Sequence, residues 1–352
     1  MTTMLSCHGL WKVFGATNAE FSALTDAERE SPEAIAAKNW VAAVRNASFD
    51  IARGEVFVIM GLSGSGKSTL VRCLSRLIEP SHGSVTIDGQ DLLGANERDL
   101  IALRRRLMSM VFQHFALLPN RSVLGNVAFP LQIHGAGRVE REARAREMIE
   151  LVGLQGREDH FPNELSGGQQ QRVGIARSLA SDPAVWFLDE PFSALDPLIR
   201  TDLQDELMKL QRQLHKTIIF ITHDLDEAIK IADRIAIMES GEIVQIGSPD
   251  ELVLSPATDY VARFVRDVPK AKVIRMEHIM EHGQGGGETA VTVGAKDTVD
   301  AVAKTVIAAD SPVSVVDEDG CVIGLVKPDT LTKVLVGLPH AIEVAKEARF
   351  AI

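Results

Sequence analysis

A glycine-rich loop between a strand-like and a helix-like segment is the feature that most constrains this chain. Residues 61–69 fit the pattern G-x-x-x-x-G-K-[ST], with the apolar run 56–60 before them and the helix-like run 70–74 after them. Glycines let such a loop turn its backbone N–H groups toward phosphate oxygens, and the following helix adds its positive N-terminal end. We therefore expect a nucleotide site, with Ser68 also a ligand of Mg²⁺, formed by Gly61, Ser63, Gly64, Ser65, Gly66, Lys67, Ser68 and Thr69.

Two carboxylates follow a second apolar run. Residues 184–188 lead into Asp189 and Glu190. An aspartate at the end of a buried strand is suited to hold Mg²⁺, and a glutamate beside it is suited to polarise the attacking water. A third apolar run, 217–222, ends at His223, where open α/β sheets keep their ligand sites. We therefore expect Asp189 to bind the metal, and Glu190 and His223 to act at the γ-phosphate.

A second anion site is predicted at the start of another helix. Ser166 is a good N-cap residue, and the two glycines after it open the helix, so backbone N–H groups are available there. This site and the loop at 61–69 open separate helices, so one chain cannot bring both to one ATP. We therefore expect a second subunit to supply the nucleotide that is contacted by Ser166, Gly167, Gly168 and Gln169.

Together with Gln113 and the run 193–196, these motifs resemble an ATP-binding cassette ATPase over residues 1–266. The resemblance implies an α/β P-loop NTPase core with a helical subdomain at about 91–165, ATP and Mg²⁺ as cofactors, and a head-to-tail homodimer. It implies that Gln113 binds Mg²⁺ and links the metal and the water to a transmembrane partner. It also implies that Asp196 lies at the dimer interface, next to the partner's nucleotide.

The same resemblance points to an aromatic residue for the adenine ring. Phe14, next to Gly15, matches the residue that stacks on adenine in the family, and Trp11 is the alternative.

An insert narrows the resemblance. Residues 16–40 separate Gly15 from the next strand, with helix-like stretches at 22–29 and 32–37. Together with the runs 58–66 and 192–200, the insert resembles the ATPase subunits of bacterial glycine betaine, proline and choline importers. This implies a peripheral motor on the cytoplasmic face of the inner membrane, which drives a transmembrane permease fed by an extracytoplasmic solute-binding protein. An importer ATPase for another amino acid or small polar solute is the alternative.

The residues after 266 have a different character. Residues 269–272 read as a linker, and the order of strands and helices from 290 to 336 resembles a single cystathionine-β-synthase (CBS) type regulatory repeat, a small α+β domain. Such repeats usually occur in pairs, so a regulatory nucleotide site between two repeats requires the second chain. A domain that only stabilises the dimer is the alternative. Asp317 and Asp319 are expected to be turn residues.

Composition narrows the remaining functions. The formal net charge of −11 and the absence of a basic stripe argue against nucleic-acid binding. The three cysteines have no metal-binding or disulfide spacing, and the first ten residues lack the features of a signal peptide. No run of eighteen apolar residues is present, so we expect no membrane span.

Two other function classes use the same loop. A small-molecule kinase leaves the motif at 165–169 and the carboxylate pair unexplained. Soluble cassette proteins of DNA repair or translation usually carry two cassettes, long coiled coils or zinc motifs, and the sequence has none of these. The importer ATPase is therefore the preferred prediction.

Overall fold

The computed structural model describes residues 2–113, 116–282, 291–309, 311–317 and 319–336. The chain divides into two compact units, Met1–Ile246 and Gly247–Ile352. This division falls earlier than the expected boundary at 266, because residues just after 247 pack with the second unit. Leu254, for example, lies in one apolar cluster with Ile274 and Met276.

A six-stranded sheet forms the centre of the first unit, in the order β10-β9-β3-β8-β7-β6. Parallel pairing joins β9 to β3, β3 to β8, β8 to β7, and β7 to β6. The apolar runs predicted to be buried strands are confirmed, because β3, β7 and β8 are buried along their whole length. The strands are β3 (Val56–Met60), β6 (Met108–Val111), β7 (Val185–Asp189), β8 (Thr217–Thr222), β9 (Arg234–Glu239) and β10 (Glu242–Gly247).

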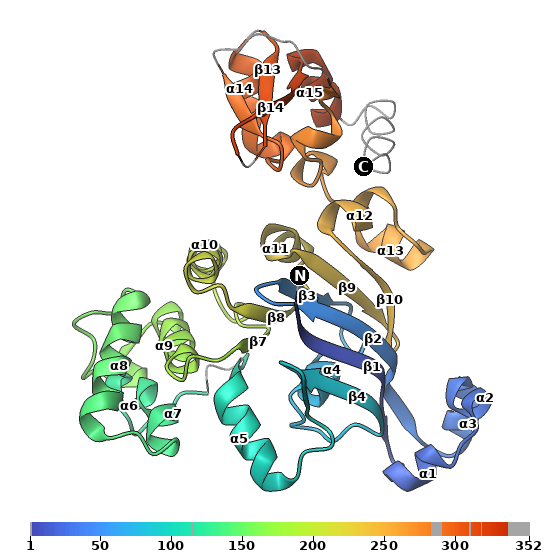
Figure 1. The fold of residues 1–352 in the computed structure, drawn as a ribbon, viewed down its shortest axis with the longest axis vertical. Helices are drawn as coiled ribbons and strands as arrows, with labels where there is room; N and C mark the ends of the chain where they lie inside the picture. The colour runs from blue at the N-terminus through green and yellow to red at the C-terminus, as the bar shows by residue number, and fades with distance from the viewer. Residues whose placement is uncertain (1, 114–115, 283–290, 310, 318, 337–352) are drawn as a thin grey trace. The chain divides into compact units, whose positions relative to one another are not determined.

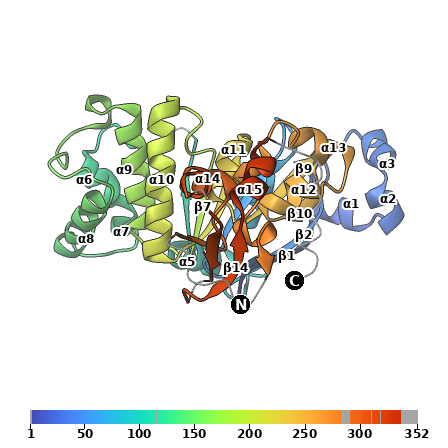
Figure 2. The ribbon, with the colours of Figure 1, turned by 90° about the horizontal axis from the view of Figure 1, so that it is seen from above.

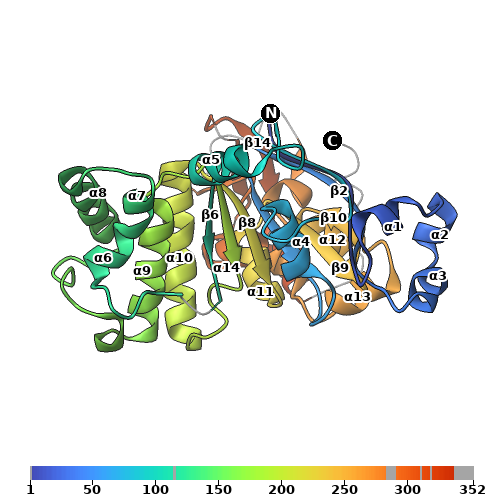
Figure 3. The ribbon, with the colours of Figure 1, turned by 90° about the horizontal axis from the view of Figure 1, so that it is seen from below.

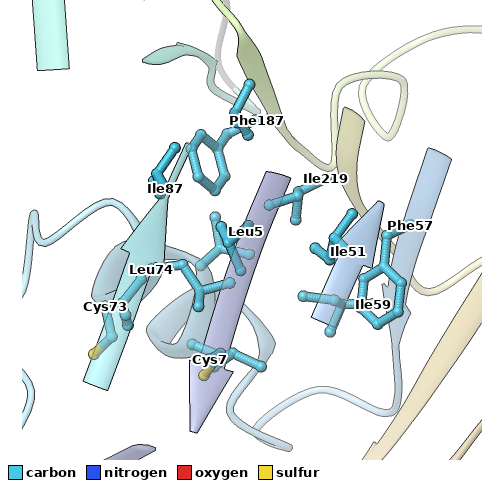
Figure 4. Packing of buried hydrophobic residues seen from close by; sticks show 14 of the residues in the cluster. Leu5, Cys7, Ile51, Phe57, Ile59, Cys73, Leu74, Ile87, Phe187 and Ile219 are labelled. Atoms are coloured by element: carbon cyan, nitrogen blue, oxygen red, sulfur yellow. The ribbon is translucent and has the colours of Figure 1, made fainter. Parts of the chain in front are cut away.

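A four-stranded sheet in the order β2-β1-β4-β5 covers the first, and helix α4 (Lys67–Leu74) follows the glycine loop. The strands are β1 (Thr3–Phe14), β2 (Val41–Ala52), β4 (His82–Ile87) and β5 (Gln90–Asp91). Figure 4 shows side chains of both sheets and of α4 packed in one core, including Leu5, Ile51, Leu74 and Ile219. The rings of Phe49 and Phe57 stack with their centroids 5.0 Å apart. This core holds β3 and α4, and therefore both ends of the loop between them.

Three short helices form the insert, at the opposite end of the first unit from α6–α9 (Figures 1 and 3). They are α1 (Asn18–Ser22), α2 (Asp26–Glu30) and α3 (Pro32–Ala37). The single helix predicted at 22–29 is corrected to α1 and α2. Thr25 and Glu28 form a capping box that starts a new helix. Phe21 and Ile35 pack on Trp11 of β1, so the insert has its own small core.

The helical part of the first unit begins later than the expected residue 91. Residues 108–111 form β6 beside β7, and α5 (Glu97–Leu107) buries Leu100 and Leu107 in the core of the two sheets. A strand of four residues after an arginine-rich helix has too little periodicity to be recognised in the sequence. The separate helical group consists of α6 (Val123–Val127), α7 (Phe129–Ile133), α8 (Arg138–Leu151) and α9 (Gly167–Leu179).

Two further helices follow the strands that carry the carboxylates and His223. Helix α10 (Pro197–Leu214) lies beside α9 (Figure 2), and α11 (Leu225–Ile231) follows β8. Both helices begin where a central strand has ended, so their N-terminal loops lie at the carboxyl ends of the strands.

The second unit contains a four-stranded sheet in the order β11-β14-β13-β12. The predicted order of strands and helices is confirmed in its described residues, and β11 was not predicted. Asp317 is a turn residue as expected, because its Oδ1 accepts hydrogen bonds from the N–H groups of Asp319 and Cys321. The elements are α12 (Pro249–Leu254), α13 (Asp259–Phe264), β11 (Glu281–His282), β12 (Thr292–Gly294), α14 (Val299–Ala308), β13 (Val313–Val316), β14 (Val322–Val326) and α15 (Pro328–Leu335).

None of the helices in the described part of the chain combines the length and the apolar character that crossing a bilayer requires.

Candidate functional site

A cavity of about 590 Å³ lies at the carboxyl ends of the central strands. The glycine loop forms one side, and the residues after β7 and β8 form the other. The structure therefore brings together the motifs that the sequence places far apart. The lining residues are Ala43, Leu62, Ser63, Gly64, Gly66, Lys67, Ser68, Thr69, Glu190 and His223.

Two glycines of the loop are required by close backbone contacts. Gly66 has φ +101°, and a Cβ on it would lie 2.2 Å from the carbonyl oxygen of Ala43. A Cβ on Gly61 would lie 2.3 Å from the carbonyl oxygen of Met238. Within this cradle the buried hydroxyl of Ser65 has no hydrogen-bond partner in the described structure. A buried polar atom without a partner fits a site that a polar ligand completes.

Lys67 begins α4 with its ammonium group folded back on the loop. Its Nζ donates to the carbonyl oxygens of Gly61 at 2.8 Å and Leu62 at 3.0 Å. Burial lowers the pKa of Lys67, and the nearby carboxylates of Glu190 and Asp189 oppose this effect. A buried ammonium that is held mainly by neutral carbonyl groups is suited to bind phosphate oxygens.

Asp189 is a buried carboxylate, 6% exposed, whose negative charge is only weakly balanced by neighbouring groups. Burial raises its pKa, the charge of Arg72 opposes this, and the charge of Glu190 adds to it. Its oxygens lie 3.9 Å from the Arg72 guanidinium and 3.4 Å from the Ser68 hydroxyl. A carboxylate and a hydroxyl are hard oxygen ligands of the kind Mg²⁺ takes alongside phosphate oxygens and water. The donor set therefore fits the predicted magnesium site.

Glu190 and His223 lie together on the far side of the cavity. The Nδ1 atom of His223 is 3.2 Å from Oε2 of Glu190. Glu190 has φ +45°, and its N–H donates to the carbonyl oxygen of Ile221 at 3.1 Å. Non-glycine residues in this conformation cluster at functional sites, where the surrounding structure holds them. The backbone thus turns the Glu190 side chain into the cavity beside His223.

The two candidates for the adenine ring differ in exposure. Trp11 is 5% exposed and packs against Phe21 with ring centroids 5.5 Å apart, so it has no free face. Phe14 is 43% exposed, and Nζ of Lys12 lies 5.1 Å from its ring centroid. Between the two, only Phe14 can stack on a ligand. Neither residue lines the 590 Å³ cavity.

Gln113 follows the end of β6, next to β7, and its side chain is exposed. It is not among the described residues that line the cavity.

The second predicted anion site has the expected helix start. Ser166 and Gln169 form a capping box, in which the Ser166 Oγ accepts from the Gln169 N–H and the Gln169 Oε1 accepts from the Ser166 N–H. Gly168 is buried against Ile199, while Ser166 and Gly167 are exposed. None of the four residues from 166 to 169 lines the cavity with the glycine loop. Asp196 is the exposed N-cap residue of α10 and is also outside the cavity.

Sequence reasoning missed two residues of the site. Ala43 lines the cavity from β2, and Arg72 compensates the charge of Asp189 from α4. No motif marks Ala43, because its part is a backbone carbonyl against Gly66. Arg72 follows the loop by one helical turn, a spacing that would have indicated a side chain near the carboxylates.

Comparison with known proteins agrees with this site. The model of the ABC transporter family matches residues 44–193. The trimethylamine N-oxide transport system ATP-binding protein TmoW of Pelagibacter ubique is 49% identical over 93% of this chain and 96% of its own length. The glycine betaine/proline betaine transport system ATP-binding protein ProV of Escherichia coli is 46% identical over 81% of this chain and 72% of its own length.

A solved structure extends the comparison to the fold. The dimeric structure of the ATP-binding cassette MJ0796 in a post-hydrolysis state, bound to ADP and Pi, is 33% identical with a TM-score of 0.58. It covers 70% of this chain and 99% of that one. The chain therefore belongs to the ABC transporter family as an ATP-binding subunit, and it is an ATPase.

Proposed function

We propose that this chain is the ATP-hydrolysing subunit of an importer for small methylated amines, of which trimethylamine N-oxide is the first candidate and glycine betaine the second. The observation that carries the proposal is the match to TmoW, which spans 93% of this chain and so reaches into the second unit. ProV, whose name gives glycine betaine and proline betaine, matches over a smaller share of its own length. An importer for another amino acid or small polar solute is the alternative.

In this proposal, Lys67 leaves the carbonyl groups of Gly61 and Leu62 and binds the β- and γ-phosphates. The N–H groups of residues 63–69 bind the remaining phosphate oxygens. Phe14 stacks on the adenine ring, with Lys12 on its other side.

The two carboxylates have different proposed roles, one in binding the metal and the other in activating the water. Ser68, Asp189 and Gln113 would hold Mg²⁺, which when bound would neutralise charge on the phosphates. Glu190 orients the attacking water and accepts its proton as the water oxygen bonds to the γ-phosphorus; the bond from the γ-phosphorus to the bridging oxygen breaks, and ADP leaves. His223, as an imidazolium, donates from Nδ1 to Glu190, which holds Glu190 in place, and from Nε2 to the γ-phosphate.

Two copies complete each site. The helix start at 166–169 does not line the cavity of its own chain, and its exposed Ser166 and Gly167 suit a phosphate brought by another molecule. We propose a head-to-tail homodimer in which this motif of one subunit closes on the ATP bound by the other. Asp196 lies at the interface between them.

A second cavity supports a permease partner. It has a volume of about 410 Å³ and lies where β6 meets α7 and α9. Phe112 and Ile133 give it an exposed apolar lining, and Arg177 lies at its side. Apolar surface with a few polar groups is typical of docking sites. Because Gln113 follows Phe112, we propose that a transmembrane permease docks here and acts on the metal site. An extracytoplasmic solute-binding protein supplies the solute to the permease. The ATPase is attached peripherally on the cytoplasmic face of the inner membrane.

For the second unit we propose a CBS-like regulatory domain that pairs with its copy in the partner and binds a regulatory nucleotide between them. The alternative is that the pair only stabilises the dimer. Its sheet and two helices provide the small α+β framework. Residues 283–290, 310, 318 and 337–352 of the proposed domain lie outside the described residues.

Transport by the complete complex tests the proposed function. The chain is purified with its permease and the complex is reconstituted in lipid vesicles. ATP is enclosed in the vesicles, and the binding protein is added outside. Uptake of trimethylamine N-oxide, glycine betaine, proline, choline and carnitine is measured, with Glu190→Gln as the control. We expect uptake of trimethylamine N-oxide or glycine betaine that stops in the variant. Uptake of an unrelated amino acid in place of the methylated amines would refute the proposed solute.

A further inference from the structure

One arginine touches both loops that flank the catalytic pair. Arg200 lies in the first turn of α10, directly after the loop that ends at Asp196. Its Nη2 donates to the carbonyl oxygen of Leu195 at 3.4 Å, and its Nη1 donates to Oδ2 of Asp224 at 3.2 Å. Leu195 precedes Asp196, and Asp224 follows His223. A single guanidinium therefore connects the two loops.

Asp224 is held on its other side as well. Its Oδ1 accepts a hydrogen bond from the N–H of Glu227 and so caps α11, and its own N–H donates to Oγ1 of Thr222 at 3.0 Å. His223 is thus the single residue between two anchored neighbours. A movement of Asp224 must reach His223, whose ring lies 3.2 Å from Glu190.

A buried contact behind the arginine keeps the two helices in register. Nε2 of Gln204 donates to Oε1 of Glu227 at 3.0 Å, and both side chains are buried. Gln204 lies one turn after Arg200 on α10, and Glu227 lies in the first turn of α11. The N-terminal ends of α10 and α11 therefore move as one body. Arg200 joins these two helix ends to the loops that contain Leu195 and His223.

We propose that Arg200 is a positioning residue that couples the loop before α10 to His223 and Glu190. The coupling rests on the proposed function, in which Asp196 meets the partner subunit. When the partner subunit contacts Asp196, it fixes the position of the neighbouring Leu195 carbonyl. That carbonyl holds Arg200, and Arg200 holds Asp224, which positions His223 against Glu190. Arg200 is not among the residues that line the nucleotide cavity, so its proposed part is to make hydrolysis depend on the closed dimer.

The test separates rate from affinity. Arg200→Met keeps the length of the side chain and removes both contacts. We expect kcat for ATP hydrolysis to fall by about 10- to 100-fold, the scale of a misplacement of about 1 Å, while KM for ATP changes by less than about 3-fold. Arg200→Lys keeps the charge but replaces the two terminal nitrogens that reach the two loops with a single nitrogen, so its kcat should lie between those of the parent and Arg200→Met.

A matched control lies on the same helices. Lys230 of α11 pairs with Asp205 of α10 at 2.7 Å and, like Arg200, is partly exposed. Lys230→Met also removes an ion pair between α10 and α11, but it touches neither loop. We expect this variant to keep the kcat of the parent. An equal loss of kcat in both variants would overturn the proposal, since it would mean that any weakening of the contact between α10 and α11 lowers the rate.

Two double-variant cycles distinguish the proposed coupling from a merely structural role of Arg200, by comparing kcat of the double variants with that of the single variants. In the complete complex, Arg200→Met is combined with Asp224→Asn and, separately, with Asp196→Asn. We expect each double variant to be no slower than the slower single variant, because all three changes break one connection. Losses that multiply in both cycles, or an Arg200→Met variant with the parent kcat, would overturn the coupling.

The parent reaction provides the remaining control. If Glu190→Gln stops turnover and Arg200→Met does not slow it, the coupling alone is refuted. If Glu190→Gln turns over normally, the proposed role of Glu190, on which the coupling rests, is refuted. Thermal unfolding of each variant identifies any loss of kcat that is due to misfolding, in which case Arg200→Lys and the Asp224 cycle decide the question.

Discussion

Substitution of one loop glycine tests the geometry of the nucleotide cavity. In Gly66→Ala, the new Cβ meets the carbonyl oxygen of Ala43 at 2.2 Å, and the residue keeps a φ of +101°. Gly64→Ala is the matched control, because Gly64 also has a positive φ, +80°, but nothing lies within 4 Å of its Cβ. Both variants bear the left-handed backbone cost of about 1–2 kcal/mol. Only Gly66→Ala adds a clash with the backbone of β2.

The difference between the two variants can be estimated from the clash. Overpacking of a tight site costs about 1–3 kcal/mol. For a domain of this size, each kcal/mol lowers Tm by about 2–4 °C, so Gly66→Ala should unfold about 2–12 °C below Gly64→Ala. Relief of the clash requires the loop or β2 to move by about 1 Å, a displacement that can lower the rate on the order of 10²-fold.

Thermal unfolding and steady-state ATP hydrolysis measure the two effects. Both are recorded for the parent protein and for the two alanine variants. The reasoning is refuted if Gly66→Ala and Gly64→Ala have the same Tm and the same kcat, because the approach of Ala43 to the loop would then be unimportant.

Three further substitutions test the charged residues. Glu190→Gln should bind ATP with the parent affinity and lose at least about 10²-fold in turnover; parent turnover would remove Glu190 from its role. Lys67→Ala should lose ATP affinity in equilibrium binding before any chemistry, so unchanged binding would count against the contact with the phosphates. Burial raises the folded pKa of Asp189 above its unfolded value, so the nucleotide-free protein loses unfolding free energy as the pH rises through the folded pKa. Asp189→Asn should therefore raise the Tm of the nucleotide-free protein at neutral pH, flatten its pH dependence and weaken Mg²⁺-dependent ATP binding. A lower Tm at neutral pH would contradict this account of burial.

Local patterns in the sequence were enough to predict the central part of the site. Continuous apolar runs mark strands buried on both faces, so β3, β7 and β8 could be placed, and with them the residues at their carboxyl ends. Because parallel strands bring those ends to one edge, Lys67, Asp189 and His223 could be expected together.

Contacts between distant segments could not be predicted in this way. The strand β6 is too short for its alternation to stand out after the charged helix α5. The approach of Ala43 to Gly66 joins β2 to the loop through a backbone atom, which no side-chain pattern records. The link from Arg200 to Asp224 depends on how α10 and α11 meet, and helix packing is not encoded in a local motif.

The composite site is the central claim, and nucleotide retention by a mixed dimer tests it most directly. Ser166→Arg subunits and Lys67→Ala subunits carry different tags, heterodimers are isolated through both tags, and ATP bound after gel filtration is counted in a Glu190→Gln background. If the loop of one subunit and the 166–169 motif of the other enclose each ATP, one site of the heterodimer bears both lesions and the other bears neither. The account predicts that the heterodimer retains ATP in this one intact site, whereas neither mutant homodimer retains any. A heterodimer that forms but retains no more ATP than the homodimers would contradict it, because each nucleotide would then depend on both motifs of a single chain.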